Sequence, residues 1–472
     1  MGLFDNFQFE PLPEHWRLEA EAWVDRYFQE IAVVQDPKNW SKFYPSLPLT
    51  RLESIMAKPD GFRSYASKVV AADPRTADLS WRVTKASQLH DDQFMTALKI
   101  IRAQASTELG SIQQHRMVYE KLDSGSLTGM DKEIVEGIHN VSEGGTDLAS
   151  ISFSKKRVCV EELRHHYQMS AVLTLDPTWD DRRWGRKWAT ETLDELFAMK
   201  PGEHVLDAFN IEFKSLLDSA TFLAFIDRVG KYQLEMQHQF YYGPMAVSMP
   251  YMRFLEESYH LAAGEKLMKA IAVAAALEGG NFGVQDLQRT LNMWYPRGLE
   301  MFGSELGGLA VKGKFKTLSN GEAQQLYIKE VQGKVRDINL SAVAAKVGCT
   351  KDAAEVYLER ILAGETVAGL TRDDLLFLPD RRFFRIRGLT EYGDFQLPGR
   401  LGQGVGYVYL PYDVHGTLMT DGGKPIPREA YVDYLKTVLP PQYMGSRHWE
   451  FVKREFLFND TWGEPERVGG SW

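Results

Sequence analysis

Cysteine and basic charge are both scarce in this chain. Its 472 residues contain two cysteines, Cys159 and Cys349, which lie far apart in sequence. Two such cysteines exclude a disulfide scaffold and an iron–sulfur cluster held by this chain alone, and they fit a reducing cytosol. Lysine and arginine together number 55 against 64 aspartates and glutamates, so the formal net charge is −9. This acidic balance argues against a general nucleic-acid-binding protein.

Long apolar runs are missing as well. The most apolar stretch, residues 270–277, is too short to span a bilayer. The first residues of the chain lack the basic region and apolar core of a signal peptide. Because 44% of the residues are hydrophobic, the chain has enough apolar surface to build a large core. We therefore expect a globular, cytoplasmic protein that does not enter the membrane.

What the chain does contain is a repeated pair of metal-binding residue types. The segment Glu162-Leu-Arg-His165 is echoed by Glu257-Ser-Tyr-His260. A glutamate and a histidine three residues apart lie on one face of a helix, so a carboxylate oxygen and an imidazole nitrogen can reach one metal ion. In di-iron carboxylate bundles, two helices with this pair are accompanied by two helices that each carry one further acid. The two segments therefore predict a dinuclear metal site.

Glu108 and Asp227 are the two further acids that the pattern favours. Hydrophobic periodicity predicts long helices at 91–122 and 210–237, and each acid lies on the apolar face of one of them. The spacing from each acid to the following Glu-x-x-His suits an antiparallel helical hairpin, once the glycine- and serine-rich segment 123–150 is allowed for. A buried acid needs a partner of positive charge, which a metal ion would supply.

Other acids on the same two helices are alternatives. Glu120 shares a predicted helix with Glu108, but it lies at the end of that helix. Glu212 and Asp218 share a helix with Asp227. The spacing to the Glu-x-x-His segments favours Glu108 and Asp227 over these three.

Two further histidines lie on these helices. His166 directly follows His165, and a role in packing or in support of a ligand fits it better than metal binding, which would break the symmetry between the two halves. His115 lies on the helix of Glu108. We expect it to be a satisfied core histidine, with support of a ligand as the alternative.

The predicted fold is all-α, with a ferritin-like four-helix bundle at residues 91–280. The two Glu-x-x-His segments lie on its helices at 154–173 and 249–277. We expect a helical N-terminal segment at 1–90 and a helical, loop-rich C-terminal extension packed on the bundle at 281–472. Within these regions we predict helices at 130–139, 184–198, 283–303, 321–363 and 428–458, and loops with short strands at 388–427.

Several stretches of the chain resemble one enzyme family. Besides the two Glu-x-x-His segments, they are Asp227-x-x-Gly-Lys-x-Gln-Leu234, Leu378-Pro-Asp-Arg-Arg-Phe383 and Gly423-Lys-Pro-Ile-Pro. With these stretches the chain resembles the oxygenase component of the benzoyl-CoA 2,3-epoxidase family. These are di-iron, ferritin-like enzymes, related to the catalytic subunit of phenylacetyl-CoA epoxidase. The resemblance covers most of the chain after residue 90 and is tightest over the predicted metal helices.

The resemblance implies a function and a set of ligands. The reaction would be an O₂-dependent epoxidation of the ring of an aromatic acyl-CoA thioester, benzoyl-CoA to 2,3-epoxybenzoyl-CoA. One oxygen atom enters the ring and the other leaves as water. The catalytic acids would be Glu108, Glu162, Asp227 and Glu257. Together with His165 and His260, they would hold two iron ions.

The resemblance also implies a partner. The electrons would come from a separate NAD(P)H-dependent flavin and iron–sulfur reductase, because this chain has neither a flavin motif nor enough cysteines for a cluster. The segment 123–150 and the N-terminal region depart from the family pattern. Another aromatic or alicyclic CoA thioester therefore stays open as the substrate. Two other hypotheses also stay open: a di-iron oxidase or N-oxygenase of a non-CoA or carrier-bound substrate, and an iron-binding or helical scaffold protein without catalysis.

A basic, aromatic segment near residue 380 is a candidate for binding the phosphates of coenzyme A. Guanidinium groups grip phosphate through paired hydrogen bonds, and nearby phenylalanines add packing. The alternative is that the same side chains pair with neighbouring acids and fix the C-terminal region on the bundle. The arginines concerned are Arg381, Arg382, Arg385 and Arg387.

Overall fold

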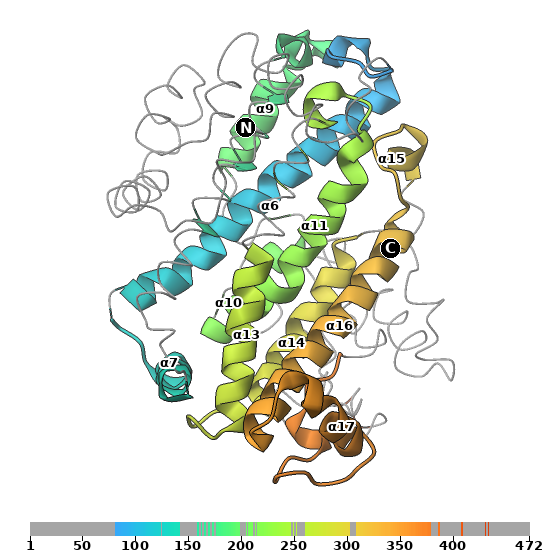
Figure 1. Ribbon diagram of the computed structural model, residues 1–472. Helices are drawn as coiled ribbons and strands as arrows, with labels where there is room; N and C mark the ends of the chain where they lie inside the picture. The colour runs from blue at the N-terminus through green and yellow to red at the C-terminus, as the bar shows by residue number, and fades with distance from the viewer. Residues whose placement is uncertain are drawn as a thin grey trace, which may run out of the picture.

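The central part of the chain is described by the computed structural model (Figure 1). The described ranges are 81–123, 125–141, 176–198, 206–210, 215–246, 260–302, 308–378, 386–387 and 407–408. Isolated described positions are 158, 159, 162, 165, 166, 169, 172, 173, 204, 213, 249, 252, 430 and 433. The segment predicted at 1–90 therefore lies almost wholly outside the described residues, as do most of the regions predicted at 388–427 and 428–458.

The described part of the chain is all-α, as the sequence predicted. Its α-helices are α6 (Asp91–Asp123), α7 (Gly129–Val141), α9 (Trp188–Ala198), α10 (Leu216–Thr221), α11 (Asp227–Met236), α13 (Leu261–Ala276), α14 (Val284–Glu300), α15 (Gly308–Lys312), α16 (Asn320–Val347) and α17 (Lys351–Leu362). The described strands are β1 (Ile386–Arg387) and β2 (Tyr407–Val408), which pair antiparallel. Within the described residues, no helix combines the length and the hydropathy needed to cross a bilayer.

Short helical turns complete the described elements. They are the 3₁₀ turns η4 (Ala86–Gln88), η5 (Pro177–Asp180), η6 (Arg183–Gly185), η7 (Asp207–Asn210), η9 (Gln237–Gln239) and η11 (Arg372–Asp374), and the π-helical segment η8 (Phe222–Ile226). The eight described positions between 158 and 173 are all helical, in agreement with the helix predicted at 154–173.

The long helix α6 carries the first predicted acid. Asp91 and Asp92 begin it, and negative charge suits the positive end of the helix dipole. Phe94 and Ile101 are fully buried on its inner face. Glu108 is buried in the middle of the helix, so α6 brings a carboxylate into the interior of the molecule.

The helix predicted at 210–237 begins later than expected. It starts at Leu216, because two aspartates accept hydrogen bonds from backbone N–H groups at this point and so cap the beginning of the helix. The backbone N–H of Ser215 donates to the carboxylate of Asp218 over 3.0 Å, and the N–H of Leu216 donates to Asp131 of α7 over 2.5 Å. Such acceptors satisfy N–H groups that have no partner inside a helix. From this point α10, η8 and α11 follow one another without interruption.

The helix α13 lies directly against η8. A Cβ atom on Gly264 would lie 2.5 Å from the backbone nitrogen of Ala224 and 2.6 Å from the carbonyl carbon of Leu223. Both atoms belong to the backbone and cannot turn away as a side chain could. Glycine at position 264 therefore allows an approach of two helical backbones that any larger residue would prevent.

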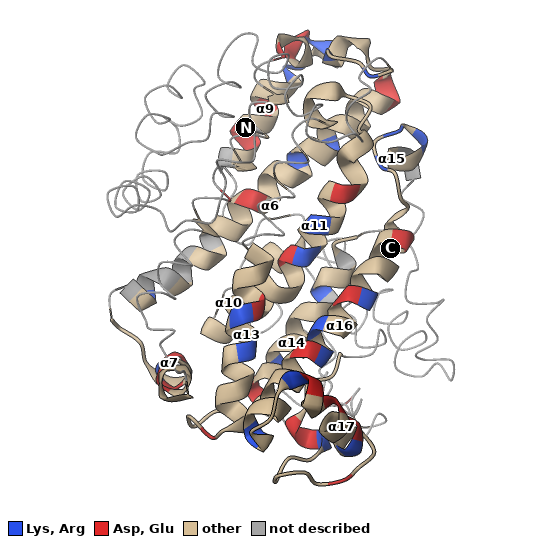
Figure 2. Ribbon diagram, in the orientation of Figure 1, with Lys and Arg blue, Asp and Glu red and all other residues tan. Residues whose placement is uncertain are grey.

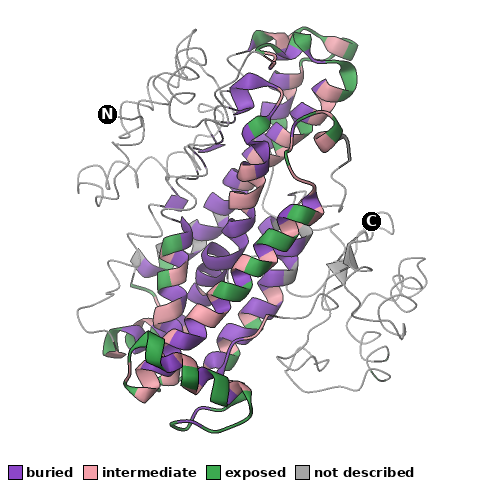
Figure 3. Ribbon diagram, turned by 45° about the vertical axis from the view of Figure 1, so that its right-hand side comes forward, coloured by how far each residue is buried: buried purple, intermediate pink, exposed green. Residues whose placement is uncertain are grey.

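One hydrophobic core joins helices from both sides of residue 280. Buried residues of α13, such as Ile271, share it with Trp294 of α14 and Val331 of α16. Figure 3 shows buried residues along the inner sides of these helices and exposed residues on the outside. Because of this common core, the division into a bundle at 91–280 and an extension at 281–472 stays a prediction.

The single helix predicted at 321–363 is in fact two helices. α16 ends at Val347, where Gly348 adopts a left-handed conformation with φ of 75°. α17 begins after Thr350, whose side chain accepts a hydrogen bond from the N–H of Ala353. Glycine after a helix and threonine before one are common stop and start residues, so the break has a local cause.

A network of charges ties α11, α13 and α16 together. Arg228 is buried and donates to both Glu265 and Glu330. Lys231 lies 3.0 Å from Glu330, and Lys334 lies 2.9 Å from Glu265. Figure 2 shows both signs of charge along α13 and α16. Each acid of this network therefore has two basic partners, so no carboxylate in it is left uncompensated. We call these five residues the Arg228 network.

Candidate metal centre

Acids and histidines that are far apart in the chain meet at one buried place. Glu108, Glu162 and His165 form one group, and Glu162, Asp227 and His260 form a second. Within each group the possible ligand atoms lie within 4.8 Å of one another. The structure thus brings together five of the six residues that the sequence predicted as metal ligands. We call the two groups together the acid–histidine cluster.

Glu162 belongs to both groups. Its Oε2 lies 3.6 Å from Nδ1 of His165, and its Oε1 lies 3.7 Å from Nδ1 of His260. The two imidazole rings are 6.0 Å apart between their centres. A carboxylate that directs one oxygen toward each histidine can bridge two metal ions. Glu257, the sixth predicted ligand, lies outside the described residues.

Each histidine has an outer acid in addition to Glu162. Glu108 Oε2 lies 3.4 Å from Nδ1 of His165. Asp227 Oδ2 lies 3.8 Å from Nδ1 of His260. The two halves of the cluster therefore repeat one arrangement, in which an imidazole stands between its own acid and the shared carboxylate.

The whole cluster is removed from water. The exposed fraction is 0% for both histidines, 1% for Glu162, 4% for Glu108 and 9% for Asp227. Burial by itself raises the pKa of Glu108, but hydrogen bonds with Glu162 and His165 and the charge of the imidazole lower this pKa to about 2. Glu108 is thereby held as a carboxylate, the form that binds metal. Three acids buried at one place need positive charge close to them.

Neighbouring polar groups orient two of the acids. Gln104 lies one turn before Glu108 on α6, and its Nε2 donates to Glu108 Oε1 over 2.5 Å. Ser111 Oγ donates to Glu162 Oε1 over 2.8 Å. Groups of this kind hold a ligand in one orientation before and after a metal ion binds.

Two of the alternative acids lie elsewhere. Asp218 caps α10 and accepts a hydrogen bond from the indole N–H of Trp294 over 2.9 Å. Glu120 lies on α6 three turns beyond Glu108, about 18 Å along the helix axis at the usual rise per residue. Asp218 belongs to neither of the two donor groups, and the backbone of Glu120 lies far from that of Glu108. Glu212 lies outside the described residues.

The two other histidines have structural surroundings. Nδ1 of His166 lies 2.9 Å from the carbonyl oxygen of Ala105, which fixes its ring against α6, and burial lowers its pKa. Nδ1 of His115 lies 3.2 Å from the hydroxyl of Ser219, and its ring meets Phe213 edge to face. The contact of His166 agrees with the predicted role in packing or in support of a ligand. Whether His115 is a satisfied core histidine or supports a ligand stays a prediction.

Irregular backbone positions the second half of the cluster. The π-helical segment η8 ends at Ile226, and Asp227 is the next residue. His260 also has a π-helical backbone. A π-helical turn holds an additional residue, so the side chains after it point in a different direction from those of a regular helix. Gly264, one turn after His260, lets α13 lie directly against η8.

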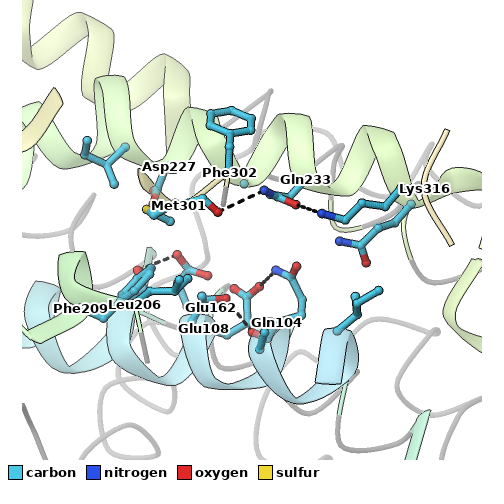
Figure 4. A pocket seen from close by; sticks show the side chains of 17 residues that line it. Gln104, Glu108, Glu162, Leu206, Phe209, Asp227, Gln233, Met301, Phe302 and Lys316 are labelled. Carbon is cyan, nitrogen blue, oxygen red and sulfur yellow. Dashed lines mark hydrogen bonds between the residues drawn. The ribbon is translucent and has the colours of Figure 1, made fainter. Parts of the chain in front are cut away.

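A cavity of about 190 Å³ lies beside three of the acids. Figure 4 shows Glu108 and Glu162 facing Asp227 across it, with Gln233 and Lys316 farther along. A cavity of about 150 Å³ with apolar walls is known to bind benzene, so this space is large enough for an aromatic ring. Its apolar lining includes Ile100, Leu206, Phe209, Ile226, Met301 and Phe302.

Sequence reasoning missed several residues of this cavity. Gln104 could have been found, because a residue one turn from Glu108 shares its face of the helix. Lys316 lies between α15 and α16 and belongs to no motif. Nothing in the sequence distinguishes it from Lys312 and Lys314 nearby, so only the fold reveals that it lines the cavity.

The arginines predicted to bind phosphate have no described side chains. Arg381, Arg382 and Arg385 lie outside the described residues, and Arg387 is described only as part of the backbone of β1. Their role stays a prediction.

The chain has a distant relative among curated proteins. No family model matches the chain. It is similar to the benzoyl-CoA oxygenase component B of Aromatoleum evansii, with 24% identity over 364 residues, which cover 70% of this chain and 69% of that protein. A similarity over most of both chains indicates a distant common origin.

Proposed function

We propose that the chain is the oxygenase component of a di-iron monooxygenase that acts on an aromatic acyl-CoA thioester. The observation that carries this proposal is the pair of donor groups that share Glu162. The similarity to a protein named benzoyl-CoA oxygenase component B supports it and favours benzoyl-CoA as the substrate. The proposed reaction is epoxidation of the ring to 2,3-epoxybenzoyl-CoA.

The residues present fit two iron ions. Each donor group would hold one ion, with Glu162 between the two and Glu257 as a further ligand. Carboxylates and imidazoles suit iron, and no thiolate is required. The positive charge of two ions would balance the buried acids. When bound, the iron ions would supply the activation of O₂, which amino-acid side chains do not perform by themselves.

The residues around the ions would prepare the site for the ring. Gln104 and Ser111 hold two of the carboxylates in place through hydrogen bonds. Phe209 and Phe302 line the cavity and give it apolar surface close to the acids. A flat aromatic ring between these apolar walls would present an edge to the donor groups.

The electrons are proposed to come from a separate NAD(P)H-dependent reductase with flavin and iron–sulfur groups. Two cysteines cannot hold a cluster in this chain. The words "component B" in the name of the relative denote one part of an enzyme with several components, which agrees with a separate electron donor. We further propose a cytoplasmic location, and binding of the CoA phosphates by the arginines between 381 and 387.

The test is turnover with a defined substrate. Iron-loaded protein is reduced without oxygen, mixed with benzoyl-CoA and ¹⁸O₂, and the acyl-CoA products are identified by mass spectrometry. We expect a product that has gained one labelled oxygen atom, and we expect Glu162→Ala to form none. Oxygen consumption without any labelled acyl-CoA would contradict the thioester substrate. It would favour a di-iron oxidase or N-oxygenase of a non-CoA or carrier-bound substrate.

The same experiment tests the non-catalytic alternative. An iron-binding or helical scaffold protein would consume no O₂ with any reductant or substrate. Exposure of the reduced protein to O₂ without substrate, followed by absorption spectroscopy of the iron, gives the control.

A further inference from the structure

Lys316 brings an ammonium group into the wall of the cavity. Its Nζ donates to Oε1 of Gln233 and to Oδ1 of Asn320, each over 3.1 Å. Both partners are neutral amides, and none of the acids in the described ranges forms an ion pair with it. Burial lowers the pKa of Lys316 to about 8. Lys316 is therefore a partly buried cation with no acid of the described ranges paired to it, an arrangement that costs free energy.

Other partly buried lysines in the described part of the chain form ion pairs with acids. Lys231 pairs with Glu330 and Lys334 pairs with Glu265, both as parts of the Arg228 network. Packing of the helices thus supplies an acid where a lysine has only a structural role. Lys316 is held in a fixed position by two amides instead, and its charge is left available to a bound molecule.

Gln233 fixes the position of Lys316 relative to the metal donors. Asp227 and Gln233 both lie on α11 and both line the cavity. They are six residues apart, which corresponds to about 9 Å along the helix. Apolar side chains such as Met301 and Phe302 line the space between them. Figure 4 shows Asp227 and Glu162 toward one end of the cavity and Lys316 toward the other, with Phe302 on one wall between them and Glu108 and Gln104 on the opposite wall.

We propose that Lys316 binds the acyl oxygen of the substrate, while the aromatic ring extends from it toward the acid–histidine cluster. The inference rests on the proposed function and adds the position and orientation of the acyl group. An ammonium group forms strong hydrogen bonds with electron-rich oxygen, and the apolar side chains of the lining, such as Met301 and Phe302, offer contacts to the ring. Two sources offer this oxygen, the carbonyl group of a thioester and the carboxylate of a free aromatic acid.

The test compares binding of ligands with and without this oxygen. Lys316→Met is prepared in the full-length, metal-loaded protein and titrated calorimetrically with benzoyl-CoA, with benzoate and with S-benzyl-CoA. The last ligand has the same ring and coenzyme but no carbonyl oxygen. We expect the variant to bind benzoyl-CoA or benzoate about 10- to 100-fold more weakly, the usual effect of losing a hydrogen bond to a charged group. Binding of S-benzyl-CoA should not change.

Two variants serve as controls. Lys312→Met removes an exposed lysine of the same segment and should leave all three affinities unchanged. Lys316→Gln keeps a polar side chain and should show the same ligand pattern as Lys316→Met. Its metal content and melting temperature establish whether it is folded, so that the test remains decisive if the methionine variant does not fold.

The outcomes separate this inference from the proposed function. If the wild-type protein binds benzoyl-CoA and the Lys316 variants bind it equally well, the inference is wrong and the proposed function stands. Equal weakening of benzoyl-CoA and S-benzyl-CoA would also overturn the inference, since the lysine would then contact the coenzyme. Binding of benzoate alone, weakened in the variants, would support the inference and contradict the thioester substrate. Binding of neither benzoate nor benzoyl-CoA would overturn both.

Discussion

Two clusters of charge meet at one helix, α11, and they are neutralised in different ways. Arg228 and Asp227 are consecutive residues of α11. Arg228 joins the Arg228 network, where its guanidinium group pairs with Glu265 and Glu330. Asp227 joins the acid–histidine cluster, where its described ion-pair partner is the imidazole of His260.

The difference shows how a fold separates structural from functional charge. The Arg228 network contains three basic residues for its two acids, so its carboxylates are neutralised as soon as the helices pack. The acid–histidine cluster gathers carboxylates around imidazoles, which carry at most one charge each and bind metal ions when neutral. Under the proposed function, metal ions from outside the chain complete the balance of charge in this cluster. The five predictions below test this contrast, beginning with the largest expected effect.

The largest effect is expected for Glu162→Ala. This residue belongs to both donor groups, so its loss should remove both of the two metal ions that we propose for each chain. Elemental analysis of the purified variant measures the loss. Ser111→Ala removes only the hydrogen bond that orients Glu162 and should retain metal. An unchanged metal content in Glu162→Ala would show that the cluster is not the metal site.

A smaller loss of metal is expected when the replaced acid, such as Glu108, belongs to only one of the two donor groups. Glu108→Ala should remove the ion next to His165 and leave the other in place. Glu120→Ala is the matched control on the same helix, about 18 Å away, and should keep both ions. If Glu120→Ala loses metal and Glu108→Ala does not, the assignment of the first outer acid is wrong.

The Arg228 network should affect stability and not metal binding. Arg228→Met leaves Glu265 and Glu330 with fewer partners, and breaking a buried ion pair costs about 3 kcal/mol of unfolding free energy. Denaturant unfolding measures the loss. Arg336→Met breaks pairs with exposed acids and should cost less than about 1 kcal/mol. Loss of metal from folded Arg228→Met would mean that the two clusters are coupled.

The same network has a dependence on pH. Burial raises the pKa of Glu330, but the hydroxyl of Tyr232 and the charges of Arg228 and Lys231 outweigh it and lower the pKa below the usual 4.5. A carboxyl with a lowered folded-state pKa stabilises the protein above its unfolded-state pKa, and this stability is lost as the pH falls through the folded-state value. The wild-type protein should therefore lose more stability below pH 4.5 than Arg228→Met does.

The smallest effect is expected where α13 touches η8. Gly264→Ala places a methyl group against backbone atoms and should cost about 1 to 3 kcal/mol, as overpacking usually does. It should also weaken metal binding, because His260 lies one turn before Gly264. Gly333→Ala on the exposed side of α16 meets no atom within 4 Å and should be neutral or slightly stabilising. If both variants behave alike, the close approach of the two helices is unimportant for the site.

Much of the fold and of the cluster could be predicted from local signals. The acidic start at Asp91 and Asp92 and the apolar face behind it predicted α6 nearly to its last residue. The spacing of Glu162 and His165 predicted that both side chains reach one point, since a helix enforces that distance. The missed break at Gly348 also had a local signal, a glycine followed by a capping threonine.

Other features had no local signal. The start of α10 depends on Asp131, which belongs to α7 and accepts the N–H of Leu216 from a distant part of the chain. The π-helical turn before Asp227 has no distinctive composition, and it is accommodated by Gly264 of another helix. Such features arise from packing between helices, which periodicity within one helix does not report.

The sequence by itself therefore determined which chemical groups are available: carboxylates and imidazoles at helical spacing, with too few cysteines for a cluster. The tertiary structure alone decided that Glu162 is shared between two histidines and that Lys316 stands at the far end of the same cavity. The physical reason is that the sequence sets distances within a helix but not distances between helices. Bond geometry fixes separations within a turn of helix, whereas separations between helices follow from how their side chains fill the core.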